Sequence, residues 1–208
     1  MGPGYDEVIA SLRQSYGDAA AAQRDAYQKE NWKLAERAAF LDRVRAQGGG
    51  RLLELGAGTG QDSLFFQENG LEVLATDLSP EMVRRCRAKG LQARVADFLH
   101  LNLPESSFDA AYALNCLLHV PNADLPAVLE SIRDVLRPGG LFFVAVYGGE
   151  GTEGPHETDN LVPPRFFSLR TDEQIRQYAE AAFEIEDFHV IDWDDNHTQV
   201  LILRRPGG

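Results

Sequence analysis

The chain has 208 residues, of which 44% are hydrophobic and 25% are charged, and these values suit a single globular domain over residues 1–208 rather than a disordered chain. Its formal net charge of −12 at pH 7 disfavours binding to nucleic-acid backbones. The sequence shows no signal peptide and no membrane-spanning apolar run, and its two cysteines are too few for a disulfide framework, so we expect a cytoplasmic protein that does not bind a membrane.

The N-terminal region is predicted to be helical over residues 5–47. Apolar residues such as Leu34, Ala38 and Leu41 recur there at helical spacing. Three successive glycines, at positions 48–50, then end the pattern. We interpret residues 1–47 as an N-terminal helical cap.

From residue 50 to residue 147, short apolar runs alternate with helical patterns. The expected strands are 52–55, 71–76, 91–96, 109–114 and 141–147. Helices are expected at 62–68, from Pro80 to about 89 with Ser79 as N-cap, and at about 125–136. This alternation predicts a doubly wound α/β fold with a parallel sheet covered on both faces, which binds ligands at the carboxyl ends of its strands.

The last third of the sequence has a different pattern. Residues 148–165 are rich in glycine and proline and are predicted to form a long loop, which is a candidate substrate lid. A helix is expected at 172–182, and strands at 183–192 and 198–204 flank a polar turn. The simplest arrangement of these two strands is a closing antiparallel hairpin.

The strongest local signal is the glycine-rich run from Glu54 to Gly60, directly after a strand and before a helix. Glycines allow a sharp turn and a close approach of the backbone to a ligand. A dinucleotide fingerprint would require a third glycine at position 61, but that residue is Gln61. The alternative is a loop that only turns the chain.

Acidic residues end the next two expected strands. Asp77 is placed to accept hydrogen bonds from ribose hydroxyls, and its alternative role is to cap the following helix. Asp97, followed by Phe98, is placed to accept a bond from an exocyclic amine such as that of adenine; alternatively it is a turn residue. Leu78 and Met82 would enclose the ring between them, or they pack in the core.

These motifs together resemble those of the class I S-adenosylmethionine-dependent methyltransferases. The segments that carry the resemblance are 54–60, 75–82, 95–98 and 136–140, and it covers residues 50–147 densely. It implies a Rossmann-like, seven-stranded, mostly parallel sheet with a C-terminal antiparallel hairpin, in which residues 50–147 form the cofactor-binding core. The implied cofactor is S-adenosylmethionine, released as S-adenosylhomocysteine. The implied cofactor-binding residues are Glu54, Gly56, Ala57, Gly58, Gly60, Asp77, Leu78, Met82, Asp97, Phe98 and Asn115.

The acceptor side of the site is less defined by the sequence. The segment 115–120 should line the reaction pocket, and its His119 has an ordinary pKa suited to a general base; alternatively this histidine is a hydrogen-bonded core residue. Candidate substrate residues are Tyr16, Trp32, Tyr147, His156 and Arg165, of which Arg165 would pair with an anionic substrate or form a surface salt bridge. We expect no metal site.

We therefore predict methyl transfer to an oxygen or nitrogen of a small metabolite or natural-product intermediate. The alternatives are RNA methylation, which would require a basic surface, and a non-catalytic cofactor-binding module, which would bind the cofactor without turnover. The motifs leave open the acceptor atom and the oligomeric state.

Overall fold

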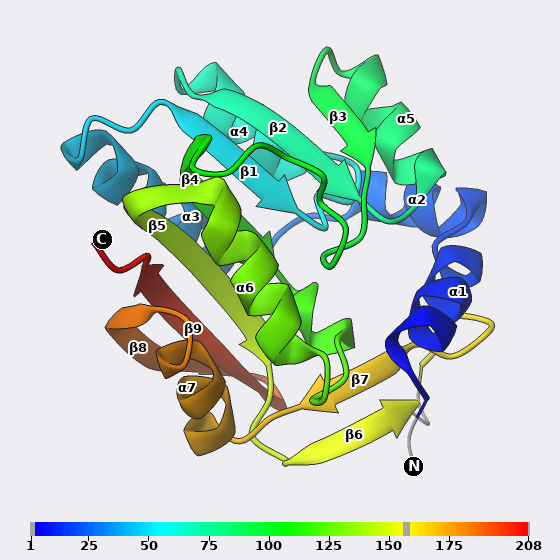
Figure 1. Cartoon of the computed structure of the whole chain (residues 1–208). Helices are drawn as coiled ribbons and strands as arrows, with labels where there is room; N and C mark the ends of the chain where they lie inside the picture. Colours follow the sequence, from blue (N-terminus) through cyan, green and yellow to red (C-terminus); the bar gives the residue numbers. More distant parts are fainter. Residues whose placement is uncertain (1–2, 156–158, 208) are drawn as a thin grey trace.

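A central mixed sheet of seven strands organises the chain, whose computed structural model describes residues 3–155 and 159–207 (Figure 1). The strand order is β3-β2-β1-β4-β5-β9-β8. The strands are β1 (Arg51–Leu55), β2 (Glu72–Asp77), β3 (Gln92–Val95), β4 (Phe108–Leu114), β5 (Leu136–Tyr147), β8 (Glu184–Trp193) and β9 (Asn196–Arg204). Strands β1 to β5 pair in parallel, whereas β9 is antiparallel to both β5 and β8. The predicted Rossmann-like sheet with a closing hairpin is thus confirmed.

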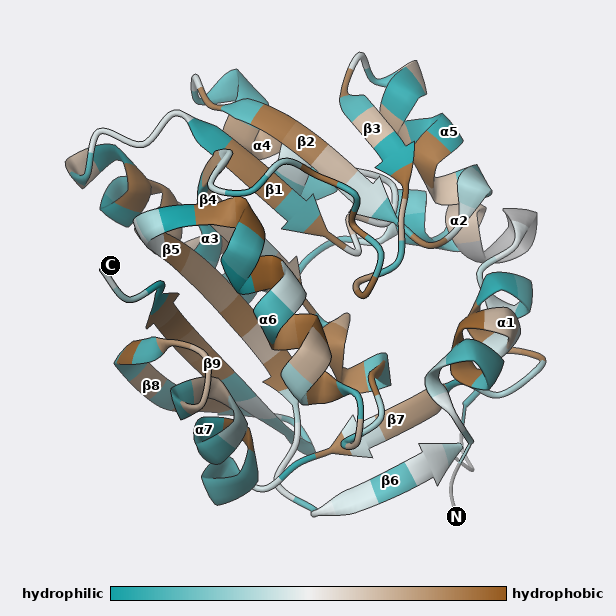
Figure 2. Cartoon of the chain, in the orientation of Figure 1, coloured by the Kyte–Doolittle hydropathy of each residue, from teal (hydrophilic) through white to brown (hydrophobic). Residues whose placement is uncertain are grey.

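Helices cover both faces of this sheet. The helices are α1 (Tyr5–Ser15), α2 (Asp18–Ala26), α3 (Asn31–Ala46), α4 (Gln61–Glu68), α5 (Pro80–Ala88), α6 (Leu125–Val135) and α7 (Asp172–Glu180), with a 3-10 turn η1 (Leu117–His119). Residues of α3 and α4 share one buried cluster with β1, β4 and β5, and residues of α6 and α7 share another. Figure 2 shows β5 and β9 mainly in hydrophobic colours and the outer helix α7 mainly in hydrophilic ones. Apolar strands between amphipathic helices thus account for the layered core.

Aromatic rings fix α3 to the sheet. Phe40 of α3 lies with its ring centroid 5.9 Å from that of Tyr112 and 5.5 Å from that of Phe143, and these last two rings stack at 4.6 Å. All three side chains are almost completely buried. At the other end of the helix, Trp32 meets Trp193 of the hairpin at 6.2 Å between centroids. Large buried rings of this kind contribute strongly to packing, so α3 has a fixed place beside the sheet.

The N-terminal region differs from the predicted continuous helical stretch. It forms three helices, α1 to α3, because the chain bends at Tyr16 and Gly17 and is extended at Tyr27 and Glu30. Val8 and Leu12 of helix α1 pack against Phe166, which lies outside the seven-stranded sheet. Helices α1 and α2 lie on the side of the carboxyl ends of the parallel strands, as Figure 1 shows, whereas α3 packs on a face of the sheet.

Two further expectations require correction. The predicted loop 148–165 contains a strand, β6 (Thr152–Pro155), which pairs antiparallel with β7 (Phe166–Leu169); a partner distant in sequence supplies its backbone hydrogen bonds. Strand β5 begins at Leu136 rather than at Leu141, because the intervening Pro-Gly-Gly pairs with the chain end through the Gly139 and Arg205 amides. The candidate residue His156 lies outside the described residues.

Within the described ranges, no helix combines the length and the hydropathy needed to cross a bilayer. Among the same residues, no group of three or more histidine, cysteine or acidic side chains is arranged to hold a metal ion.

Candidate active site

The glycine loop between β1 and α4 adopts a backbone that requires glycine. Gly56, Gly58 and Gly60 have φ angles of 62°, 56° and 80°, in the left-handed region that other residues rarely occupy. A Cβ at Gly56 would lie 2.5 Å from the Cβ of Cys116, and one at Gly60 would lie 2.6 Å from Leu91 Cδ1. A Cβ at Gly58 would meet no atom within 4 Å. The loop is therefore packed against the core at its two ends and open at its middle.

Asp77, at the end of β2, faces this loop. The Gly58 N–H donates to Asp77 Oδ2 and the Ser79 N–H donates to Oδ1, both at 2.8 Å. Removal of water around the carboxyl raises its pKa to about 6. Ser79 caps α5 by accepting a bond from Met82 N, which confirms the predicted cap. Asp77 therefore bonds both the glycine loop and the residue that caps α5.

A cavity of about 980 Å³, counting its open mouth, lies above this loop. Nine of the residues predicted to bind the cofactor line it: Glu54, Gly56, Ala57, Gly58, Asp77, Leu78, Met82, Phe98 and Asn115. Gly60 is not among its lining residues, since its place is in the packed end of the loop. Asp97 lines a smaller neighbouring cavity with Phe98, and its Oδ1 accepts bonds from the amides of Leu99 and His100.

A buried charge network lies at one end of the cavity. Burial and the neighbouring Asp62 raise the pKa of Glu54 to about 8, and Glu54 accepts a bond from the Ser63 hydroxyl. Asp62 itself pairs with Lys29 and Arg37, each at 2.8 Å. Lys29 lines the cavity, so this end of it has a cationic group within reach of a ligand.

A second cavity, of about 960 Å³ with its mouth, adjoins the first. The two share the lining residues Tyr16, Arg24, Tyr27, Lys33, Asn115 and His119. Three predicted substrate residues, Tyr16, Tyr147 and Arg165, come together in its wall. Trp32 is in neither lining, because it packs between α3 and the hairpin.

His119 is held at both ring nitrogens. Nδ1 lies 2.7 Å from the carbonyl oxygen of Phe166, which can only accept, so Nδ1 carries the proton. The Tyr16 hydroxyl therefore donates to Nε2 at 3.0 Å, and Arg165 Nη1 donates to the Tyr16 oxygen at 3.0 Å. Burial lowers the pKa of His119 to about 3, so the ring is neutral at pH 7. Base catalysis by His119 would require the bond to Tyr16 to open.

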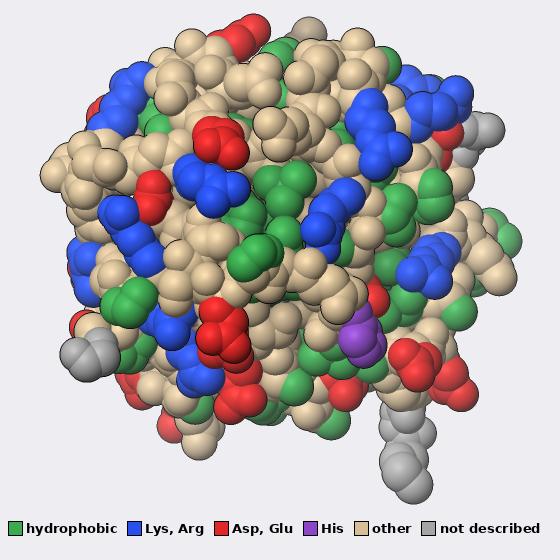
Figure 3. All heavy atoms as spheres, turned by 45° about the horizontal axis from the view of Figure 1, so that its top comes forward, with side chains coloured by type: hydrophobic (Ala, Val, Ile, Leu, Met, Phe, Trp, Pro, Cys, Tyr) green, Lys and Arg blue, Asp and Glu red, His purple; other side chains and the backbone are tan. Residues whose placement is uncertain are grey.

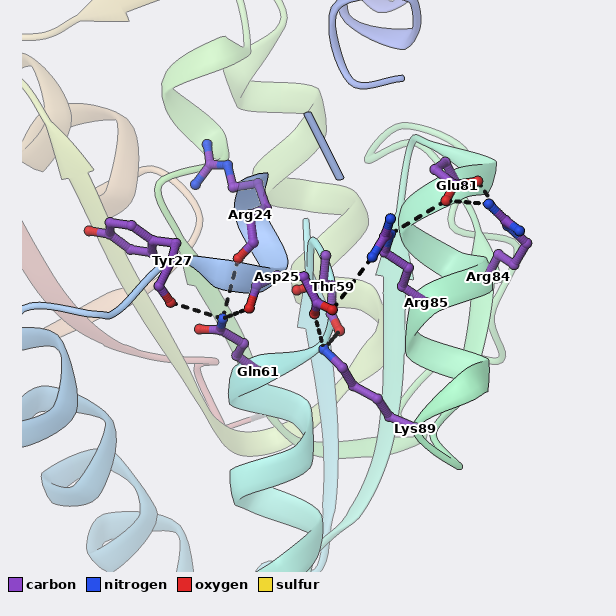
Figure 4. A network of polar contacts seen from close by, with 9 residues as sticks. All are labelled: Arg24, Asp25, Tyr27, Thr59, Gln61, Glu81, Arg84, Arg85 and Lys89. Carbon is purple, nitrogen blue, oxygen red and sulfur yellow. Dashed lines mark hydrogen bonds and ion pairs between the residues drawn. The ribbon is translucent and has the colours of Figure 1, made fainter. Parts of the chain in front are cut away.

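The sequence-based reasoning missed several residues that shape these cavities. Among them is Gln61, whose side chain donates to the carbonyls of Arg24, Asp25 and Tyr27 at 3.3, 3.3 and 3.1 Å (Figure 4). Lys89 donates to Asp25 and to the Thr59 carbonyl. The end of α2 is thereby tied to the glycine loop. Only the break in the dinucleotide pattern at Gln61 signalled this position.

Comparisons with known proteins agree with this geometry. Residues 52–140 match the family model described as a methyltransferase domain. The chain is 31% identical over 146 residues to a ubiquinone biosynthesis O-methyltransferase of Xanthomonas oryzae pv. oryzae, covering 67% of this chain and 59% of the relative. It is 35% identical over 129 residues to a malonyl-[acyl-carrier protein] O-methyltransferase of Serratia marcescens, covering 61% and 46%. The chain thus spans less than two thirds of the length of these curated relatives.

A solved structure gives the same fold over nearly the whole chain. It is a 1,6-didemethyltoxoflavin-N1-methyltransferase of Burkholderia thailandensis with bound 1,6-didemethyltoxoflavin and S-adenosylhomocysteine, with a TM-score of 0.77 and 24% identity over 98% of this chain and 91% of that one. The fold, the glycine loop with its facing carboxylate and the matched residues 52–140 lead to one conclusion: this chain is a member of the class I S-adenosylmethionine-dependent methyltransferase family.

Proposed function

We propose that this protein transfers the methyl group of S-adenosylmethionine to an oxygen or nitrogen of a small metabolite or natural-product intermediate, with release of S-adenosylhomocysteine. The observation that carries the proposal is the carboxylate of Asp77. It lines a cavity while the Gly58 and Ser79 amides hold it at 2.8 Å. A carboxylate held in this way suits a pair of ribose hydroxyls.

The residues of the first cavity fit such a cofactor. The position at Gly58 offers open space where a ligand can approach the backbone, and the buried Asn115 Oδ1 has no hydrogen-bond partner among the described residues. Leu78, Met82 and Phe98 offer apolar surface for an adenine ring. These observations support a nucleoside ligand with a polar end near Asn115.

The position of Asp97 suggests a role in binding the adenine. Asp97 lies beside Phe98, and its Oδ2, in contact with the exposed ring of His100 at 3.2 Å, is the oxygen proposed to accept the adenine amine. Lys29, which lines the same cavity, is already paired with Asp62 at 2.8 Å. When bound, the cofactor supplies a methyl group on a sulfonium.

The chain itself contributes positioning. Asn115 lies in the lining of both cavities and has a φ of 53°, while its amide donates to the Ala145 carbonyl at 2.7 Å. We place the reacting atoms beside it, at the boundary between the cavities. Holding two reactants aligned can lower a barrier by several kcal/mol, on the order of 7 or more in favourable cases. Tyr16, just after α1, and Arg24 of α2 line both cavities at this boundary.

The charge distribution favours a small molecule over RNA. In α5, Arg84 pairs with Glu81 and Arg85 with Asp25, and Lys89, just after the helix, also pairs with Asp25. The face shown in Figure 3 carries both basic and acidic side chains, with acidic ones most frequent in its lower part. A nucleic-acid surface would concentrate the basic ones. The O- and N-methyltransferases among the relatives leave the acceptor atom undecided.

Calorimetric titration with S-adenosylhomocysteine, with a nicotinamide dinucleotide as control, tests the cofactor class. We expect saturable binding of the former only. Incubation with labelled S-adenosylmethionine and a panel of hydroxylated and amino aromatic compounds then tests turnover. Preference for the dinucleotide would refute the proposal, and cofactor binding without transfer to any acceptor would support the non-catalytic alternative.

A further inference from the structure

We propose that the methyl acceptor is a planar small molecule that is negatively charged at neutral pH, and that Arg24 binds its charge. This inference rests on the proposed function and adds to it a class of substrate and a residue that selects it.

Three cationic side chains border the second cavity, and two of them are neutralised by the protein. Arg165 pairs with Asp159 through Nε at 2.9 Å and Nη2 at 2.8 Å. The almost completely buried Lys33 pairs with Glu30 at 2.7 Å. Arg165, the residue that the sequence suggested for an anionic substrate, therefore already has an anionic partner.

Arg24 is the third cation, and its guanidinium has no hydrogen bond or ion pair with any described part of the chain. Its guanidinium carbon lies 5.9 Å from the centroid of the Tyr16 ring. Arg24 lines both cavities, and its positive potential reaches Asp77 in the first and His119 in the second. An unpaired guanidinium at this junction is suited to a carboxylate or another oxyanion.

The place of Arg24 is fixed by its backbone. The two N–H groups of Gln61 Nε2 are shared among three carbonyl oxygens around the end of α2, and Asp25 is held by Lys89 and, at 3.5 Å, by Arg85. In Figure 4 the side chain of Arg24 extends away from this network. The guanidinium is thus carried by an anchored segment while its own charge stays uncompensated.

The wall of the second cavity favours a flat partner. It includes the rings of Tyr16, Tyr27, Tyr147 and Phe167. Aromatic side chains bind planar ligands by offset stacking and edge-to-face contacts. A planar body among these rings would bring an anionic group to Arg24.

An ionised acceptor also agrees with the state of His119. With a pKa of about 3 and with Nε2 bonded to Tyr16, this ring does not take up a proton at neutral pH. An acceptor whose ionised group is itself the nucleophile needs no base. Its oxygen or nitrogen lone pair forms the bond to the methyl carbon, the carbon–sulfur bond breaks, and that electron pair stays on sulfur as a neutral thioether.

The test uses the full-length protein saturated with S-adenosylhomocysteine. Matched pairs of planar acids and their primary amides are titrated, such as benzoate and benzamide, nicotinate and nicotinamide, and their hydroxylated forms. Variants are Arg24→Gln, Arg24→Lys and the control Arg13→Gln, which changes an exposed arginine of α1 that lines neither cavity.

We expect at least one acid to bind about tenfold or more tightly than its amide in the wild type and in Arg13→Gln, with an affinity that falls as salt is added. Arg24→Gln should remove this preference and Arg24→Lys should retain part of it, when each variant is titrated at a concentration of S-adenosylhomocysteine that saturates it. Equal binding of acids and amides, no acid binding, an unaffected Arg24→Gln, or a loss of S-adenosylhomocysteine binding that no concentration restores would overturn the inference. Failure of the wild type to bind S-adenosylhomocysteine would instead refute the proposed function.

Discussion

The two cavities share a wall but are built differently. The first is made by the backbone: three glycines with positive φ turn under it, and amides of Gly58 and Ser79 hold its key carboxylate. The second is made by side chains from distant segments, since Tyr16, His119 and Arg165 meet there through hydrogen bonds of 3.0 Å. A site that is shaped by the backbone tolerates few amino-acid substitutions. In a site that is shaped by side chains, substitutions can change which ligand is bound.

The largest effect should come from a glycine of the first cavity. Gly56→Ala combines a left-handed backbone with a Cβ 2.5 Å from that of Cys116. We expect a loss of about 3–5 kcal/mol in the free energy of unfolding, measured by urea denaturation. Gly58→Ala is the matched control, because its Cβ would meet no atom within 4 Å, and it should lose only about 1–2 kcal/mol. Equal losses would show that packing under the loop is unimportant.

The second effect concerns the ligand rather than the fold. Asp77→Ala removes the carboxylate proposed to bind both ribose hydroxyls, and should weaken binding of S-adenosylhomocysteine by about 2–3 kcal/mol, roughly thirty- to a hundred-fold. Calorimetry measures the loss, with Asp42→Ala, an exposed acid of α3, as the control. If Asp77→Ala binds as tightly as the control, the ribose assignment is wrong.

A third effect depends on pH. From about pH 4.5 to about pH 8 the folded protein keeps a proton on Glu54 that the unfolded chain releases. The contribution of Glu54 therefore lowers the free energy of unfolding as pH rises through this window, by up to about 1.4 kcal/mol per unit. Glu54→Gln should remove this contribution in urea titrations between pH 5 and 8, and Glu105→Gln, at an exposed position, should not. An unchanged slope in Glu54→Gln would mean that Glu54 is ionised in the folded state.

The smallest effect should occur in the second cavity. Tyr16→Phe removes the hydroxyl between His119 and Arg165, at a cost of about 1 kcal/mol in thermal or urea unfolding. Tyr178→Phe is the control, since the ring of Tyr178 contacts the Arg170 guanidinium while its hydroxyl has no hydrogen-bond partner among the described residues. A loss as large as that of Gly56→Ala would contradict the proposed difference between the two cavities.

The same difference explains what could be predicted from the sequence. Gly56, Gly58, Asp77 and Asn115 follow strands in one parallel sheet, so strand order alone brings them together. The hairpin and the N-cap of α5 could be predicted as well, because each follows from a short stretch of sequence.

Long-range side-chain geometry could not be predicted in this way. Nothing near Arg24 in the sequence indicates that Gln61 anchors its backbone. Likewise, the residues around Arg165 do not indicate whether this arginine is unpaired or forms its ion pair with Asp159. Strand β6 depends on pairing with β7, which its glycine and proline content does not suggest. Such features depend on the fold as a whole rather than on a periodic pattern.

The contact between α3 and the hairpin has a practical consequence. The chain has two tryptophans, Trp32 and Trp193, and their rings lie 6.2 Å apart, close to Tyr147 and to the ammonium of Lys33. Indole fluorescence therefore originates at the contact between α3 and the β8–β9 hairpin, beside the second cavity. The unmodified protein thus carries an optical reporter with which stopped-flow mixing can follow the arrival of an acceptor.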